Sequence, residues 1–293
     1  MSMSSTVALI VTTLVGATVN GALGYGFSSI TVPLALLFLT NRALNPAIVI
    51  IEVALNAGVL FMNRDSVPFV FRRVLPIVIG LLPGVVIGTF VISMVSPSIL
   101  KLGTFTVLLP LILLQAAGFR RPIQAERSAG FAFGGALGLL YSVTTISGPP
   151  LAVALNNQGI AKRDFRAALA TVRLAESTLT AIAYLSAGMF TTTTFGLVGR
   201  ILPSIAIGIP LGAHLIRHVR PETFRRVCMS FDAWIVAFGV STLVRELSIV
   251  DGAGAYSILV GVVIVDILLL YRFFVAAPSP RETPRAVDAV ATS

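Results

Sequence analysis

The chain alternates long apolar stretches with short polar and basic ones. The apolar stretches predict helices over residues 7–24, 28–40, 46–62, 74–95, 98–118, 128–143, 146–156, 167–188, 198–216, 227–244 and 255–271. Two of these segments, 28–40 and 146–156, each follow a cluster of Gly, Ser, Thr and Pro. They would reach only about 15–20 Å, too short for a hydrocarbon core of about 30 Å. We therefore expect each to be the return arm of a helical hairpin that enters and leaves on the same side of a membrane.

A pattern of glycine, proline and glutamate occurs twice in the chain. The matched stretches are 84–88 with 208–212 and 52–55 with 176–179, at an offset of 124, and 33–35 with 150–152, at an offset of 117. In a membrane chain, such a duplication is typical of a transporter that is built around the boundary between its two copies.

The composition indicates that lipid surrounds the chain. Of 293 residues, 56% are hydrophobic and 11% are charged, which leaves too little polar surface to cover a soluble domain of this size. A single cysteine, Cys228, excludes an internal disulfide and a Cys-rich metal site. Basic residues exceed acidic ones by 21 to 12, but they are dispersed over short loops, so nucleic acid is not an expected partner.

The basic residues indicate the topology, because cytoplasmic loops of membrane proteins are enriched in Lys and Arg. With the N-terminus outside, sixteen of the 21 fall in cytoplasmic segments, four fall in outer segments, and Arg173 lies within a predicted helix. Each copy then contains one hairpin and three crossings, an odd number, so the second copy is predicted to be inverted relative to the first. We expect a multi-pass protein of the bacterial cytoplasmic (inner) membrane with a cytoplasmic C-terminus.

The predicted fold class is an all-α polytopic membrane protein. It comprises two inverted-topology repeats, each a broken-helix hairpin plus three transmembrane helices, and one extra C-terminal transmembrane helix. The predicted boundaries are 1–118 for the first repeat, 119–127 for a cytoplasmic linker, 128–250 for the second repeat, 251–275 for the extra helix and 276–293 for a disordered cytoplasmic tail.

The hairpin tips are the segments in which ligand chemistry is expected. Glycine allows the chain to leave a helix, Ser28, Ser29 or Ser147 can cap the next one, and proline is tolerated in a first helical turn. A helix that starts inside the membrane directs unpaired N–H groups and the positive end of its dipole toward the midplane, where they favour an anion. The alternative is that the breaks are kinks that permit close packing. The candidate substrate-binding residues at the tips are Gly24, Tyr25, Gly26, Phe27, Ser28, Ser29, Thr144, Thr145, Ser147, Gly148 and Pro149.

Arg173 and two glutamates form a second group of candidates. A charge inside a membrane is costly enough to indicate function, and the planar guanidinium of Arg173 suits an oxyanion substrate. Glu52 and Glu176, which the repeat relates, are the candidate carriers of a coupling proton. The alternative is that Arg173 and Glu176, one turn apart on the same helix face, only neutralise each other.

Several other residues are given structural interpretations. Tyr141 lies beside the second tip and either offers its hydroxyl to a ligand or packs there. Asp232 and Asp266 are expected to pair with partners rather than to bind substrate. His214 and His218 are expected to interact with carbonyl groups at a helix end. The two Gly-x-x-x-Gly motifs are expected to be packing faces.

The Gly-rich tip before Pro33, the basic turn Asn63-Arg-Asp-Ser66, the Gly84-x-x-x-Gly88 helix and the repetition of these features after Arg127 carry a family resemblance. From about residue 7 to about residue 245, the chain resembles the sulfite exporter TauE/SafE family of membrane transporters. One departure is that the tips read Tyr-Gly-Phe-Ser-Ser and Ser-Gly-Pro-Pro, whereas many relatives have a run of glycines.

The resemblance implies transport of a small anion such as sulfite, sulfoacetate, another organosulfonate or a related carboxylate, outward and coupled to protons. Together with the tips it favours a secondary transporter that works by alternating access. A passive anion channel is one alternative, and an intramembrane enzyme that uses Ser147 and a histidine is another. The sequence predicts no enzyme activity, cofactor or metal site. The expected partners are a small anionic substrate, protons and the lipid bilayer, and the oligomeric state stays open.

Overall fold

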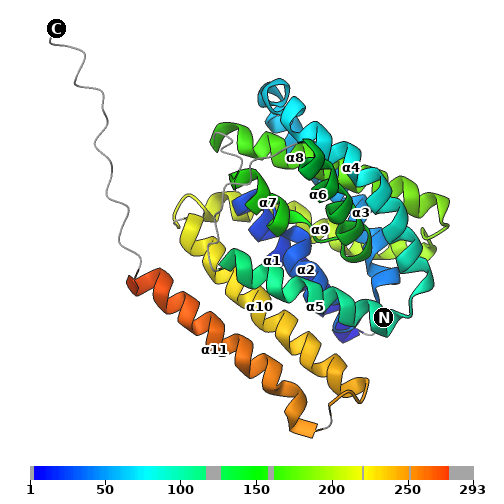
Figure 1. Cartoon of the computed structure of the whole chain (residues 1–293), viewed down its shortest axis with the longest axis vertical. Coiled ribbons are helices and arrows are strands. Elements are labelled where there is room, and N and C mark those ends of the chain that lie inside the picture. Colours follow the sequence, from blue (N-terminus) through cyan, green and yellow to red (C-terminus); the bar gives the residue numbers. More distant parts are fainter. Residues whose placement is uncertain (1–2, 117–126, 158–161, 220, 251, 277–293) are drawn as a thin grey trace, which may run out of the picture.

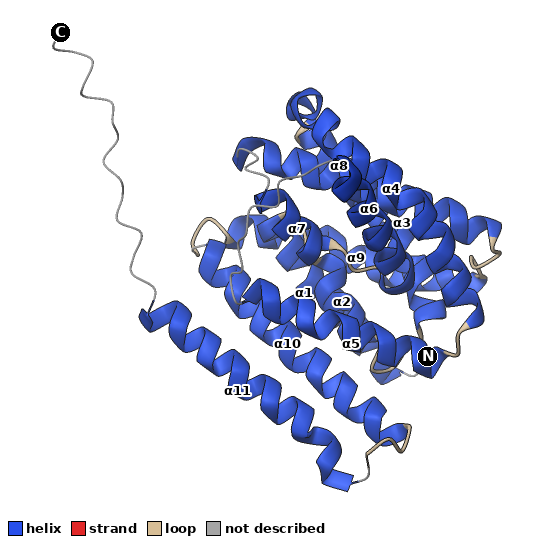
Figure 2. Cartoon of the chain, in the orientation of Figure 1, coloured by secondary structure: helices blue, strands red, loops and turns tan. Residues whose placement is uncertain are grey.

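The computed structural model describes residues 3–116, 127–157, 162–219, 221–250 and 252–276, and within these ranges every regular element is helical (Figure 1, Figure 2). The α-helices are α1 (Met3–Leu23), α2 (Phe27–Ala35), α3 (Asn41–Met62), α4 (Val67–Met94), α5 (Pro97–Ala116), α6 (Arg127–Thr144), α7 (Gly148–Asn157), α8 (Lys162–Ser186), α9 (Thr192–Leu215), α10 (Pro221–Glu246) and α11 (Ser257–Tyr271). Short helical turns η1 (Arg64–Ser66), η2 (Gly252–Tyr256) and η3 (Arg272–Ala276) complete them. The predicted linker lies outside the described residues up to Arg127, and the predicted tail lies outside them from residue 277.

The eleven predicted segments correspond to the eleven α-helices, and the two segments that were expected to be too short to span are indeed short. α2 has nine residues and α7 has ten. Several helices begin earlier than the apolar pattern indicates. α9 begins at Thr192, where the side chains of Thr191 and Thr194 form a capping box, although its apolar stretch starts at residue 198. Hydropathy detects the apolar interior of a helix and misses a polar first turn.

Six stretches of the described residues are long and apolar enough to cross a membrane: Met3–Leu23, Asn41–Met62, Arg64–Met94, Thr192–Leu215, Arg226–Glu246 and Gly252–Val275. The apolar parts of α5 and α6 are shorter, and α8, which the sequence also predicts to cross, is not in this set. The all-α polytopic fold class is confirmed. The inverted orientation of the second repeat stays a prediction.

The helices of the two predicted repeats pack across one another. α4 of the first repeat packs along α6 of the second, and α9 of the second packs along α1 of the first. α3 and α8, which occupy equivalent places in the two repeats, contact each other, as do α5 and α10 (Figure 1). The central contact between α3 and α8 therefore joins corresponding elements of the two copies.

Glycines permit the closest of these helix contacts. A Cβ atom at Gly84 would overlap the backbone oxygen of Gly135 in α6, and a Cβ atom at Gly212 would overlap the backbone oxygen of Thr18 in α1. Small residues of this kind let helix backbones approach closely in membrane proteins. The interpretation of both Gly-x-x-x-Gly motifs as packing faces is confirmed.

We expect Gly212→Ala to lower the thermal stability of the purified protein, because the added methyl group would force α9 away from α1. Overpacking of this kind costs about 1–3 kcal/mol. Gly199→Ala is the matched control, since it lies on the same helix and its added Cβ would meet no atom within 4 Å. Equal melting temperatures for the two variants would show that α1 and α9 are not held by this contact.

α11 lies at the edge of the bundle, beside α10 (Figure 1). A buried ion pair joins the two helices, in which Arg226 Nη2 lies 2.9 Å from Asp266 Oδ1. The side chain of Asp266 is fully buried, and that of Arg226 is 4% exposed. Asp266 thus has the pairing partner that the sequence predicts. Arg226, which was expected in a cytoplasmic segment, lies within α10.

Asp266→Asn is expected to destabilise the protein, because it leaves the guanidinium of Arg226 buried without its carboxylate. Removing one partner of a buried ion pair costs about 3–5 kcal/mol. The double variant Arg226→Gln/Asp266→Asn removes both charges and should recover much of this loss. Thermal unfolding of the three proteins in one detergent checks the prediction, and a double variant as unstable as the single one would contradict it.

Candidate functional site

The first helix break lies between α1 and α2. Gly24 and Gly26 have φ angles of 79° and 104°, in the left-handed region that favours glycine, so the chain can end one helix and start the next within three residues. Gly26 is the N-cap of α2, and Ser28 and Ser29 lie inside its first turn. The expectation that one of these serines caps the helix is therefore wrong. Phe27 is fully buried and packs against α1.

The second break lies between α6 and α7. The hydroxyl of Thr144 donates to the Leu140 oxygen at 2.7 Å and accepts the N–H of Ile146 at 3.1 Å, which closes the end of α6. Thr145 has a φ of 56°, a conformation that costs a non-glycine residue about 1–3 kcal/mol. α7 then begins at Gly148, and Pro149 lies in its first turn, where a missing N–H costs the helix nothing.

Side chains from α3 and α8 hold the broken end of α6. Asn45 Nδ2 donates to the Val143 oxygen at 2.7 Å, Asn41 Nδ2 lies 3.4 Å from the same oxygen, and the Tyr184 hydroxyl donates to the Ser142 oxygen. Carbonyl groups at a helix end lack partners within the helix, so these donors satisfy the groups that the break exposes. Sequence reasoning missed the two asparagines because it began this helix at residue 46. Two amides directly before an apolar stretch were the available signal.

Arg173 of α8 pairs with Glu52 of α3 and not with Glu176 of its own helix. Arg173 Nη2 lies 2.5 Å from Glu52 Oε1, and the two side chains are 2% and 1% exposed. The hydroxyl of Tyr141 donates to the other oxygen of Glu52 at 2.6 Å. The alternative in which Arg173 and Glu176 neutralise each other is therefore wrong about the partner, because the ion pair joins the two repeats.

Glu176 faces the second break. The hydroxyl of Ser147 donates to Glu176 Oε2 at 2.5 Å, and the glutamate is fully buried. The partner of Ser147 is thus a carboxylate and not the histidine that the enzyme alternative needs. His214 and His218 lie at the end of α9, where His218 Nδ1 is 3.3 Å from the His214 oxygen. This contact confirms that a histidine interacts with a carbonyl group at the helix end.

Gly148 is the point at which both breaks and Arg173 meet. A Cβ atom at Gly148 would lie 3.5 Å from Tyr25 Cδ2, 3.9 Å from Ser29 Oγ and 3.9 Å from Arg173 Nη1. Tyr25 and Ser29 belong to the first tip, and Gly148 belongs to the second. We call this region the junction. Which residues meet at the junction depends on how α8 is rotated about its axis, and a hydropathy pattern does not determine this rotation.

Several buried polar atoms on α2 and α8 have no hydrogen-bond partner among the described residues. They are Ser28 Oγ, Ser29 Oγ, Arg173 Nε and Glu176 Oε1. An unsatisfied buried polar group costs about 1–3 kcal/mol, and native proteins contain few of them. The hydroxyl of Ser29 and the guanidinium N–H of Arg173 are hydrogen-bond donors, so the junction has spare donors for an oxyanion.

The junction gathers some of the predicted site residues and excludes others. The side chains of Tyr25, Ser29 and Arg173 each lie within 4 Å of the Cβ position of Gly148. An ion pair links Glu52 to Arg173, and a hydrogen bond links Glu176 to Ser147 beside Gly148. The remaining candidates serve the breaks themselves. Gly24 has Arg166 as its nearest neighbour, Phe27 packs on α1, and Thr144 and Thr145 form hydrogen bonds to the backbone of the second break.

A small cavity of about 30 Å³ adjoins the first tip. Tyr25, Ser29 and Pro149 line it from the tips, and Cys228 and Asp232 line it from α10. This volume holds about one water molecule. No ion pair among the described residues includes Asp232, so the expected charged partner is not observed there, and its Oδ1 is buried without a hydrogen bond.

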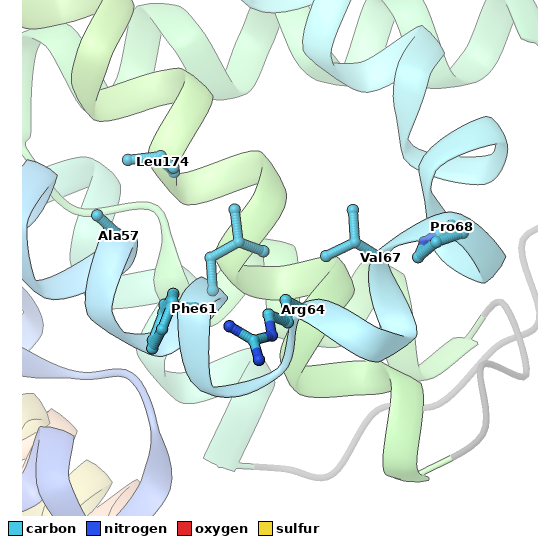
Figure 3. A pocket seen from close by; sticks show the side chains of 7 residues that line it. Ala57, Phe61, Arg64, Val67, Pro68 and Leu174 are labelled. Carbon is cyan, nitrogen blue, oxygen red and sulfur yellow. The ribbon is translucent and has the colours of Figure 1, made fainter.

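A larger cavity of about 480 Å³ lies between α3, the start of α4 and α8. Figure 3 shows Arg64 on the bend beside Phe61, with Val67 and Pro68 at the start of α4 and Leu174 on α8. The guanidinium carbon of Arg64 is 4.8 Å from the centroid of the Phe61 ring. No tip residue lines this groove, which we call the Arg64 groove.

The comparisons with known proteins place the chain in a family. The family model described as sulfite exporter TauE/SafE matches residues 8–239, a range that begins in α1, ends in α10 and contains both breaks and Arg173. No curated protein and no solved structure matches the chain. The family is one of membrane transporters and not of enzymes, which agrees with the several membrane-spanning helices. The chain belongs to the TauE/SafE sulfite exporter family.

Proposed function

We propose that the protein is a secondary transporter that moves a small anion across the bacterial cytoplasmic membrane by alternating access. Its substrate is sulfite, an organosulfonate such as sulfoacetate, or a related carboxylate. Transport is outward and is coupled to protons. Family membership supports the substrate class. The junction supports the location of the binding site.

The observation that carries the proposal is the position of Arg173. Its guanidinium is buried, gives Nη2 to Glu52, and has Nε without a partner among the described residues. An anion beside Gly148 accepts hydrogen bonds from this planar group and from the hydroxyl of Ser29. The N-terminus of α7 starts at Gly148 and adds the positive end of a helix dipole.

Glu52 and Glu176 are the proposed proton carriers. Glu52 and a bound anion compete for the same guanidinium, so a proton on Glu52 weakens the ion pair and frees Arg173 for the substrate. Glu176 reaches the second tip through Ser147. Proton and anion therefore bind together. An anion with two negative charges then leaves with a net charge, which an inside-negative membrane potential drives outward.

Alternating access is proposed to depend on the way in which helices of the two predicted repeats pack across one another. Glycine contacts join α1 closely to α9, and α4 closely to α6. Each of these two pairs contains one helix from each predicted repeat. Movement of one pair relative to the other would open the junction to one side of the membrane at a time. The proposed orientation places the N-terminus outside and the C-terminus in the cytoplasm.

Flux into proteoliposomes tests the function and separates it from a passive channel. Sulfite and isethionate are the probes, and the sulfonate of isethionate keeps its charge over the pH range used. With the membrane potential clamped at zero, we expect an imposed pH gradient to drive accumulation of the anion above its outside concentration, and a protonophore to abolish it. Flux that only equalises the two concentrations would indicate a channel. No flux of either probe would contradict the assignment of sulfite and organosulfonate substrates.

A further inference from the structure

α10 carries a buried acid, Asp232, close to the first tip. Asp232 is 6% exposed, and its Oδ1 has no hydrogen-bond partner among the described residues. It lines the small cavity beside the first tip together with Tyr25 and Ser29, and Pro149 of the second tip lines the same cavity. The carboxyl group of Asp232 therefore shares a cavity with residues of both tips.

Among the described residues, no basic side chain lines the cavity of Asp232. The arginines next to the tips are Arg166, whose Nε lies 3.8 Å from the Cβ position of Gly24, and Arg173 at the junction. α1 and α2, which pack against α10, contain no charged side chain. On α11, Asp266 is paired with Arg226. On α5, Lys101 lines a separate cavity with Glu246.

Two other titratable side chains line the cavity of Asp232. They are those of Tyr25 and Cys228. Tyr256 of η2 packs instead against Phe238 and Arg245. No ion pair within the described residues includes Asp232.

We propose that α10 completes the anion site and that Asp232, in its protonated form, donates a hydrogen bond to the bound anion. A carboxylate repels a neighbouring anion, and none of the described residues that line this cavity is a cation. A proton converts the same group from an acceptor with a negative charge into a neutral donor. Anion affinity therefore rises as Asp232 takes up a proton, in addition to the linkage through Glu52. This inference rests on the proposed transport of an anion.

Cys228 provides a native reporter for the cavity. It lies one turn before Asp232 on α10, lines the same cavity, and is the single cysteine of the chain. An anion that binds at the adjoining junction and accepts a hydrogen bond from Asp232 should slow alkylation of the thiol by N-ethylmaleimide in the wild-type protein. The experiment needs no substituted residue, and a single labelled site makes the readout unambiguous.

Calorimetric titration of the purified protein with sulfite and isethionate over a range of pH tests the role of Asp232. Asparagine keeps a hydrogen-bond donor but cannot titrate. The Asp232→Asn variant is therefore expected to bind the anion and to take up one proton fewer than the wild type when it does so. The affinity of this variant should change about tenfold less per pH unit than that of the wild type. Glu246→Gln is the matched control, because it removes an acid from the exposed end of the same helix, outside the cavity.

Two results would overturn the inference. One is an Asp232→Asn variant that binds the anion with the pH dependence of the wild type. The other is a wild-type thiol that is alkylated at the same rate with and without saturating anion, and this result is available even when the variant does not fold. A wild type that binds neither probe would overturn the proposed function itself, which is a distinguishable outcome.

Discussion

Arg173→Gln should lower the affinity for the transported anion by about 100-fold or more. The guanidinium offers the anion charge-assisted hydrogen bonds worth about 1.5–3 kcal/mol each, and two of them account for a factor of this size. Glutamine retains an N–H donor but has neither the charge nor the planar fork. Calorimetric titration with sulfite and isethionate measures the loss, and flux into proteoliposomes should fall with it.

The single variant leaves Glu52 buried without its partner, which would by itself destabilise the protein. The charge-neutral double variant Glu52→Gln/Arg173→Gln separates the two effects. It should fold with a melting temperature near that of the wild type and still fail to bind the anion. A folded double variant with wild-type affinity would show that Arg173 only forms a structural ion pair and does not bind the anion.

Gly148→Ala should impair transport without a loss of stability, which is the opposite of the effect expected for Gly212→Ala. The added methyl group would meet Tyr25, Ser29 and Arg173 at 3.5–3.9 Å, ordinary contact distances, so the fold can accommodate it. It would occupy the space between Arg173 and both tips, where the anion is proposed to bind. Alanine also favours a helix over glycine by about 0.5–1 kcal/mol.

The measurements for Gly148→Ala are the melting temperature and the concentration dependence of anion flux. We expect an unchanged or raised melting temperature and an affinity reduced by about tenfold, the factor that corresponds to about 1.4 kcal/mol. Gly103→Ala is the control, because this helical glycine of α5 has no atom within 4 Å of its added Cβ. Wild-type flux in a stable Gly148→Ala protein would show that the anion does not bind at the junction.

The sequence was sufficient to predict the helical architecture and the two breaks, because both depend on local chemistry. Runs of apolar residues specify the helices, and glycine and proline clusters specify where α2 and α7 start. The identity of the helix cap was not predictable in the same way. Gly26 takes the N-cap position of α2 because the sharp turn there needs a positive φ, which overrides the capping preference of Ser28 and Ser29.

The partners of the buried charges could not be predicted, because they depend on how each helix is rotated and which helix lies next to it. Spacing along α8 suggests that Arg173 meets Glu176, whereas contact between α3 and α8 brings Glu52 to it. The cavity beside Asp232 likewise exists only because α10 packs against α2. A hydropathy pattern indicates how deep in the membrane these residues lie, but not which residues are their neighbours.

The position of a bound anion is the most direct test of the site. Crystals of the wild-type protein grown with selenite, a heavier analogue of sulfite, would locate the anion through anomalous scattering from selenium. We expect the peak at the junction, within hydrogen-bond distance of the Arg173 guanidinium and beside Gly148. A peak in the Arg64 groove, with the junction empty and the Arg173–Glu52 pair intact, would contradict the proposed site.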